Sequence, residues 1–375
     1  MRTCLLFFLG MLVLSAPLSI QAQELVQDTT VTMKAKVLEV ISEETLEVEG
    51  TGVMSTDQSL RIEVLDGPEK GTELIVENDY FVLEKSDVFY LTHTTDGMSG
   101  IDLYAVSEPF RLTALLVLGI LFVAVVVTFG GIQGIRGLLS LIGSLFFIVF
   151  LLLPGIMNGY PPILVAVGVA SVIIVGASYI THGFTRTTSV AVFGMILTVT
   201  LTGILAYIAI PFAQLSGYTS DETMYLNMNT GGTLNIAGLL IGSMIIGTLG
   251  VLYDAAIGQA VAVEELIAAG SHLSPREVYK RAIRIGREHI GALVNTLAIA
   301  YVGAALPLLL LFYGYGNGDV LMSINREIFA TEIVRTIVGS IGIVLAVPIT
   351  TAIAVKLLWG RVAAVSARPH HTHSH

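Results

Sequence analysis

The sequence predicts a polytopic α-helical membrane protein with a small all-β domain near its N-terminus. Apolar residues make up 54% of the 375-residue chain and charged residues only 13%, which is too little charge for a water-soluble globule. After residue 109 the apolar residues gather in seven long segments, and the Lys and Arg residues between them lie almost entirely on alternate loops. Together these patterns predict both the number of membrane crossings and their direction.

Residues 1–22 have the pattern of a secretory signal. Arg2 supplies the positive start, Leu5 to Leu14 the apolar centre, and small residues lead to a cleavage site ending at Ala22. An uncleaved N-terminal anchor is the alternative, and in both cases the next segment is exported. Cys4, the only cysteine, lies inside this signal, so the mature chain has no thiol for disulfides, metal binding or catalysis.

Residues 23–108 are predicted to form the exported β domain. Apolar and polar residues alternate as they do in half-buried strands, and the turn Asp66-Gly67-Pro68 separates two of the candidates. The domain carries 19 acidic and 5 basic residues, so nucleic acid is not an expected partner. Short strands in this number favour a small antiparallel barrel or sandwich, with an OB-like barrel among the alternatives. The simplest role is a cap or spacer on the membrane domain. The candidate strands are Val31–Val40, Thr45–Val48, Leu60–Leu65, Glu73–Val76 and Val88–Thr92.

The membrane domain is predicted to cover residues 109–360, with a His-rich tail at 361–375. A bilayer core of about 30 Å needs roughly 20 apolar residues per helix. Seven segments meet that requirement: 111–129, 137–154, 161–181, 188–212, 235–258, 290–313 and 336–357.

The distribution of positive charge predicts the orientation. With the β domain outside, ten Lys and Arg residues fall on the inner side, and the outer loops after the first span hold only Arg326. This asymmetry predicts an N-terminus outside and a C-terminus inside the bacterial cytoplasmic membrane. The inner residues are Arg136, Arg186, Arg276, Lys280, Arg281, Arg284, Arg287, Lys356, Arg361 and Arg368.

The fifth predicted span carries the strongest candidate site. An ionisable residue in a span, here Asp254, is a candidate for ion coupling or proton relay. Asn295 in the sixth span should lie at similar depth, and with Gln259 these residues form a candidate ion, substrate or coupling site. The alternative is that Asp254 lies near the inner end and that Asp254 and Asn295 only join two helices. Small residues on the face of Asp254 predict close helix packing: Ser243, Gly247, Gly250 and Gly258.

A basic helix is predicted near residues 274–290. Ser274, Pro275 and Glu277 form a capping box, which marks a helix start. Its cations should face anionic lipid at the inner membrane surface, while a gate or a docking site for a cytoplasmic partner is the alternative. The basic face comprises Arg276, Lys280, Arg284 and Arg287, and the apolar face comprises Val278, Ala282 and Ile285.

Other charged groups have structural interpretations or none. Glu332 and Arg335 are three residues apart, which predicts a structural ion pair at the outer end of the seventh span. The tail residues His370, His371, His373 and His375 are too weak a pattern to predict a metal site. The chain contains no Walker A loop, dinucleotide fingerprint, HExxH or nucleophile elbow, so neither an enzyme nor a cofactor is expected.

Several motifs resemble the YibE/F-like family of multi-spanning bacterial membrane proteins. The resemblance extends over most of residues 30–355, including the exported segment 66–71, and is most specific over 236–301. It implies a multi-pass membrane fold and a permease. The sequence departs from the usual pattern at Glu288 and at Gly258-Gln259. The matching motifs are Ile241-Gly242, Gly247-Thr248-Leu249-Gly250, Asp254, Glu264-Glu265-Leu266, Gly286-Arg287, Asn295-Thr296-Leu297, Ala300-Tyr301, Gly339-Ser340 and Pro348-Ile349-Thr350.

These observations favour a secondary transporter or permease of an unknown ion or small solute. The alternative is a membrane scaffold or sensor that presents the acidic exported domain and relays to partners through the 274–290 helix. The expected partners are the bilayer, with anionic lipid at its inner surface, the transported solute and a second copy of the chain.

Overall fold

The computed structural model describes residues 29–48, 52–97, 99–270, 272–315 and 320–366. The predicted signal and the four His residues of the tail lie outside the described residues. The chain divides into two compact units, residues 1–122 and 123–375, and each is described by itself.

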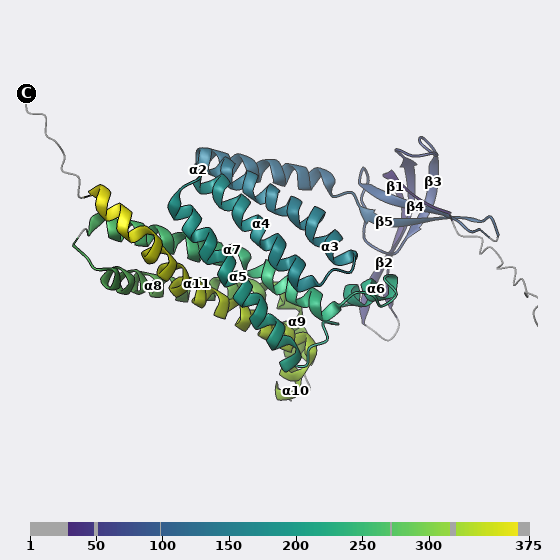
Figure 1. The fold of residues 1–375 in the computed structure, drawn as a ribbon. Helices are drawn as coiled ribbons and strands as arrows, with labels where there is room; N and C mark the ends of the chain where they lie inside the picture. The colour runs from purple at the N-terminus through teal and green to yellow at the C-terminus, as the bar shows by residue number, and fades with distance from the viewer. Residues whose placement is uncertain (1–28, 49–51, 98, 271, 316–319, 367–375) are drawn as a thin grey trace, which may run out of the picture. The chain divides into compact units, whose positions relative to one another are not determined.

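The first unit contains a five-stranded antiparallel sheet (Figure 1), and the alternating sequence pattern predicts all of its strands except the last. The strand order is β3-β2-β1-β4-β5, and the two edge strands β3 and β5 also contact each other, so the sheet curls towards a barrel. The strands are β1 (Thr29–Val48), β2 (Val53–Val64), β3 (Glu73–Asn78), β4 (Val88–Thr95) and β5 (Asp102–Pro109).

Strand β1 holds the sheet together because it pairs with β4 over its first half and with β2 over its second. The two strand segments predicted at Val31–Val40 and Thr45–Val48 are therefore one strand. Register shifts after Val37 and after Val40 bend it, which lets one strand serve both partners. Met33 and Val37 are buried on its inner face.

Two buried amides fasten the 79–83 loop to the sheet. Asn78 Nδ2 donates to Gln58 Oε1 at 3.0 Å, and that same oxygen accepts the backbone N–H of Leu83 at 2.8 Å. Gln58 Nε2 in turn donates to the carbonyl of Leu83 at 3.0 Å. Gln58 is fully buried, so its polar atoms are retained in the core only because each has a partner.

A second polar cluster joins β4, β5 and the turn after β2. His93 Nδ1 lies 2.9 Å from a carboxylate oxygen of Glu69, and His93 Nε2 lies 2.9 Å from Asp102. The rings of His93 and Tyr104 stack with centroids 4.5 Å apart, and Tyr104 donates to Glu69 at 3.0 Å. Hydrogen bonds from Thr95, at 2.7 Å, and from His93 hold the pKa of Asp102 below its usual value.

The second unit is helical. Its elements run from α2, which begins within the first unit, to the C-terminal α11. In chain order they are α2 (Leu112–Phe147), the π-helix η1 (Ile148–Leu152), α3 (Leu153–Met157), α4 (Pro162–His182), α5 (Arg186–Phe212), α6 (Asp221–Asn229), α7 (Ile236–Ala269), α8 (Pro275–Ala304), α9 (Leu306–Tyr315), α10 (Val320–Asn325) and α11 (Glu327–Ser366).

By length and composition, five of the described helical segments could cross a membrane, or six if the bent pair α8 and α9 forms one span. Seven spans therefore stay a prediction, as does their orientation. The difference arises mainly at Leu112–Met157, a 46-residue run that contains the first two predicted spans. Gly131 interrupts this run with φ 54° and ψ −137°, values outside the helical region, so the backbone kinks between the predicted spans 111–129 and 137–154.

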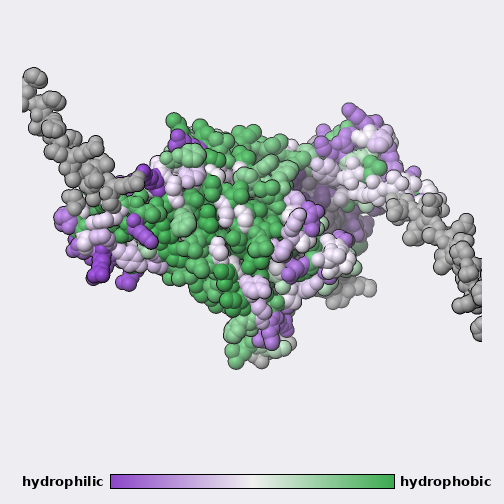
Figure 2. Space-filling model, in the orientation of Figure 1, coloured by the Kyte–Doolittle hydropathy of each residue, from purple (hydrophilic) through white to green (hydrophobic). Residues whose placement is uncertain are grey.

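Helices α5, α7 and α11 form the centre of the helical unit, and glycines allow them to approach closely. A Cβ atom on Gly194 of α5 would lie 2.6 Å from the Thr350 hydroxyl oxygen of α11. One on Gly339 of α11 would lie 2.5 Å from Cγ2 of Thr248 on α7. Large apolar side chains are exposed around this centre, as the broad hydrophobic surface in Figure 2 shows, which suits contact with lipid.

The start of α11 is tied to the loop after α5. The Glu327 carboxylate accepts the backbone N–H groups of Ser216 and Gly217 at 2.6 and 2.7 Å, as well as the Ser216 hydroxyl at 2.8 Å. Gly217 has a φ of 88°, and a Cβ there would lie 2.8 Å from the carbonyl oxygen of Ile236. This anchor fixes the end of α11 that lies beside the candidate site.

Candidate functional site

The helix predicted over 290–313 is broken in the structure. Helix α8 ends at Ala304, α9 begins at Leu306, and the two are bent by 64°. Pro307 explains the break, because its backbone has no N–H and its ring clashes with the carbonyl four residues earlier. A break within an apolar segment frees backbone polar groups, which membrane proteins accept where those groups are buried in protein or line a cavity.

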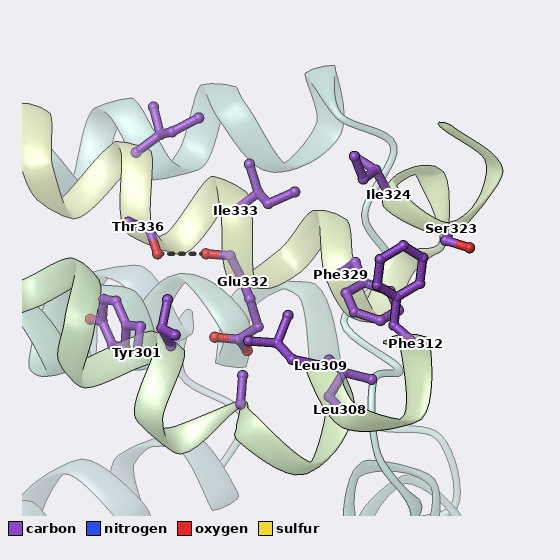
Figure 3. A pocket seen from close by; sticks show the side chains of 13 residues that line it. Tyr301, Leu308, Leu309, Phe312, Ser323, Ile324, Phe329, Glu332, Ile333 and Thr336 are labelled. Carbon is purple, nitrogen blue, oxygen red and sulfur yellow. Dashed lines mark hydrogen bonds between the residues drawn. The ribbon is translucent and has the colours of Figure 1, made fainter. Parts of the chain in front are cut away.

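A cavity of about 350 Å³ lies beside this bend. Its lining comes from α8, α9, α10 and the first turns of α11, and most of it is apolar. Figure 3 shows the Glu332 side chain directed towards α8, between Tyr301 and Leu309. The lining residues are Tyr301, Val302, Ala305, Leu308, Leu309, Phe312, Ser323, Ile324, Phe329, Glu332, Ile333, Thr336 and Ile337.

The charged residue that lines this cavity, Glu332, forms an ion pair with Arg335. Arg335 Nη1 lies 2.8 Å from Oε1 and 3.0 Å from Oε2 of Glu332, and both side chains are mostly buried. The Arg335 guanidinium also lies over the ring of Tyr301, 5.8 Å from its centroid, at a distance suited to a cation–π contact. The sequence predicts the Glu332–Arg335 pair, but not its place beside a cavity or its contact with α8.

Polar atoms without partners gather around the same pair. Among the described residues, five buried side-chain polar atoms have no hydrogen-bond partner, and three of them belong to Tyr301, Thr331 and Arg335. The Tyr301 hydroxyl points away from the cavity towards α7, where a Cβ atom on Gly247 would lie 2.7 Å from it. Buried polar atoms are normally satisfied, so an unsatisfied group needs an explanation such as a bound ligand or a second conformation.

The predicted site at Asp254 and Asn295 has a different character. Both residues are exposed in the single chain, and neither side chain forms a hydrogen bond with any of the residues described. Asp254 interacts electrostatically with His182, the last residue of α4. The structure therefore does not join Asp254 and Asn295 directly, and their proposed joint role stays a prediction.

His182 belongs to a polar cluster that the sequence analysis missed. Its Nδ1 lies 3.1 Å from the hydroxyl of Tyr253, which also contacts the Thr181 hydroxyl at 2.5 Å. A small polar cavity of about 140 Å³ borders this cluster. It is lined by His182, Thr185, Thr187, Thr188, Ile257, Val261 and Glu264, and so approaches Asp254 without including it.

Gln259 joins α7 to α8. Its side chain is buried, and Nε2 donates to the backbone carbonyl of Ala282 at 2.7 Å. A Cβ atom on Gly286 would lie 2.7 Å from Oε1 of Gln259, so this glycine makes room for the amide. The contact is typical of interhelical packing between spans.

The predicted small-residue face of α7 is mostly open in the single chain. Gly250 and Gly258 would gain no neighbour within 4 Å if a Cβ were added, and the Ser243 hydroxyl bonds within its own helix to Leu240. Only Gly247 meets another helix closely, at Tyr301. The tightest packing of α7 in this chain instead involves α11.

The basic segment is not a separate helix. Helix α8 begins at Pro275 with the predicted Ser274–Glu277 capping box and continues without interruption to Ala304. On its inner face Val278, Ala282 and Gly286 are buried, whereas Ile285, predicted on the same face, is 38% exposed. This buried face holds the segment against α7 and α11. The four predicted basic residues are exposed: Arg276, Lys280, Arg284 and Arg287.

Comparison with known proteins gives one match. A family model described as YibE/F-like protein matches residues 118–360, which is more than half of the chain and covers α4 to α9 and most of α2 and α11. No curated protein and no solved structure matches the chain. The likeness of the exported segment 66–71 to this family lies outside the matched residues and stays a prediction.

Proposed function

The chain belongs to the YibE/F-like family, and from that premise we propose that it is a secondary transporter or permease whose solute site is the cavity at the α8–α9 bend. Family membership and the apolar helices support a multi-pass membrane protein. Transport, the solute and the direction of movement are the proposal.

The observation that carries the proposal is the broken helix beside a cavity with charged groups. Transporters commonly place their substrate and ion sites at discontinuous helices. Here Glu332 lines the cavity and pairs with Arg335, Tyr301 also lines it, and most of the remaining wall is apolar. This lining suits a small solute that is largely apolar and carries one or two polar groups.

The group around Asp254 is proposed as the coupling-ion site. Asp254 and His182 interact electrostatically and both can exchange protons, and a polar cavity borders His182. Asn295 and Gln259 keep their proposed places near this group, Gln259 as the residue that joins α7 to α8. An ionisable residue in a membrane span is by default a candidate for proton or ion coupling.

Purified protein in liposomes tests this function. Uptake and efflux would be measured across a panel of ions and small solutes, with empty liposomes as the control, and with and without an imposed proton gradient. A transporter should move at least one solute, and Asp254→Asn should remove the effect of the gradient. If no solute moves while the protein is folded and correctly inserted, a membrane scaffold or sensor is favoured instead.

A further inference from the structure

A groove lies at the start of α8, at the opposite end of this helix from the cavity at the α8–α9 bend. It has a volume of about 620 Å³ and is formed by the first turns of α8 and the later part of α11. Figure 2 shows hydrophilic residues gathered at this end of the helical unit. The groove is lined by Pro275, Arg276, Tyr279, Lys280, Ala352, Val355, Lys356 and Trp359.

Three cations surround this groove without an ion-pair partner among the described residues. Arg276, Lys280 and Lys356 are exposed, and none of them forms an ion pair with another described residue. The nearby carboxylate of Glu277 is already used, because it accepts the backbone N–H and the hydroxyl of Ser274 at 2.8 Å each. The groove therefore presents three positive charges to whatever occupies it.

The walls between these cations are apolar and aromatic. Tyr279 and Trp359 are partly buried at the groove, and Val355 is buried. Tyr and Trp are enriched at the boundary between the bilayer and water, where one part of the ring is in an apolar environment and another part contacts water. The α11 wall continues a helix that is long and apolar enough to cross a membrane.

We propose that this groove binds the headgroup and upper acyl chains of an anionic phospholipid. The phosphate would contact Arg276, Lys280 and Lys356, and the glycerol and first methylene groups would lie against Tyr279, Val355 and Trp359. Basic pockets between membrane helices bind anionic headgroups in this way. A free phosphate ion would use the cations but not the apolar walls, which is why the groove favours a lipid. The proposal does not depend on transport.

Trp359 offers a direct measurement because it is the only tryptophan in the chain. The full-length protein would be reconstituted in phosphatidylcholine vesicles containing a minor fraction of lipid with brominated acyl chains, which quench tryptophan on contact. The expected result is stronger quenching by brominated phosphatidylglycerol than by the same fraction of brominated phosphatidylcholine. Equal quenching by the two lipids would overturn the proposal.

Charge variants separate the groove from the rest of the basic helix. Arg276→Gln, Lys280→Gln and Lys356→Gln together should remove the preference for the anionic lipid. Each cation at an anionic surface strengthens binding roughly fivefold at low salt, so the loss should be on the order of a hundredfold in relative affinity. The matched control removes three exposed cations of α8 outside the groove, by Arg281→Gln, Arg284→Gln and Arg287→Gln, and should keep the preference.

Two outcomes would overturn the proposal even if the parent protein shows the preference. One is that the control variant loses the preference for the anionic lipid as completely as the groove variant, which would assign that preference to the overall positive charge of α8. The other is that inorganic phosphate, compared with chloride at equal ionic strength, abolishes it, which would assign the groove to free phosphate. Thermal unfolding in detergent would show that each variant is folded. The primary test, which compares quenching by the two brominated lipids, needs only the parent protein.

Discussion

Gly247 of α7 faces the hydroxyl of Tyr301 on α8, and a Cβ atom on this glycine would lie 2.7 Å from that oxygen. Gly247→Ala should therefore push the Tyr301 ring towards the cavity and destabilise the protein by about 1–3 kcal/mol, as overpacking does. Gly250→Ala, one turn later on the same helix, would meet nothing within 4 Å and should leave the protein as stable as the parent or up to about 1 kcal/mol more stable, because Ala favours the helix. Thermal unfolding in detergent compares them, and equal effects would contradict the close contact.

The Glu332–Arg335 pair should contribute to stability because both side chains are mostly buried. A double-mutant cycle with Glu332→Gln and Arg335→Gln should give a coupling energy of about 1–2 kcal/mol, between the values for exposed and fully buried pairs. Unfolding of the two single variants and the double variant measures it. A coupling energy near zero would show that the two side chains do not pair in the folded protein.

Gln259 should contribute more to stability than Gln133, another glutamine of the helical unit that donates to a backbone carbonyl. Gln259→Leu removes a buried hydrogen bond to the carbonyl of Ala282 and should lower stability by about 0.5–1.5 kcal/mol, the net contribution of a typical hydrogen bond. Gln133→Leu removes a similar bond to Thr181 at an exposed position, where water can replace it, and should have a smaller effect. If Gln133→Leu is the more damaging, the assigned α7–α8 contact is wrong.

Asp102 should make the β domain less stable in acid. Hydrogen bonds from Thr95 and His93 lower its pKa in the folded state below the unfolded value of 3.8. The stabilisation is then fully present above that value and is lost as the pH falls through the lower, folded-state pKa. Thr95→Val removes the hydrogen bond that lowers the pKa of Asp102 most. The stability of this variant should therefore change less than that of the parent between pH 5 and pH 3. Hydrogen exchange of β4 and β5 amides in the full-length protein measures the stability of the parent and of the variant at each pH. Identical pH profiles would rule out this role for Thr95.

Local patterns predicted much of the fold. Alternation located β1 to β4, because half-buried strands expose every second residue, but it did not predict β5 (Asp102–Pro109). It divided β1 into two, since the stretch Ile41 to Glu44 at the register shifts has no regular apolar period. The capping box located the start of α8 correctly. The amphipathic pattern of 274–290 suggested a separate helix, although nothing between this segment and the apolar one that follows breaks the backbone.

The candidate site was harder to predict for a physical reason. Pro307 is visible in the sequence and marks the bend, but apolar periodicity does not distinguish the packed face of a span from the lipid-facing one, because lipid is as apolar as the helix contacts. All the glycines on Asp254's face therefore resembled packing residues, whereas only Gly247 makes a close contact there and Gly250 and Gly258 make none. Gly194 and Gly339 make further close contacts between helices. The unsatisfied hydroxyl of Tyr301 depends on the position of α7 and has no local sequence signal.

The most direct test of the proposed function is the effect of Tyr301→Phe on solute flux in proteoliposomes. Because the Tyr301 hydroxyl has no partner among the described residues, removing it should leave thermal stability unchanged or slightly higher. In the proposed transport cycle this hydroxyl gains a partner when the protein changes conformation, so flux should fall by about tenfold or more, as expected for one lost hydrogen bond of 1.4 kcal/mol or more. Flux equal to the parent's in a folded, inserted Tyr301→Phe protein would contradict this role of Tyr301 and, with it, the proposed part of the α8–α9 bend in transport.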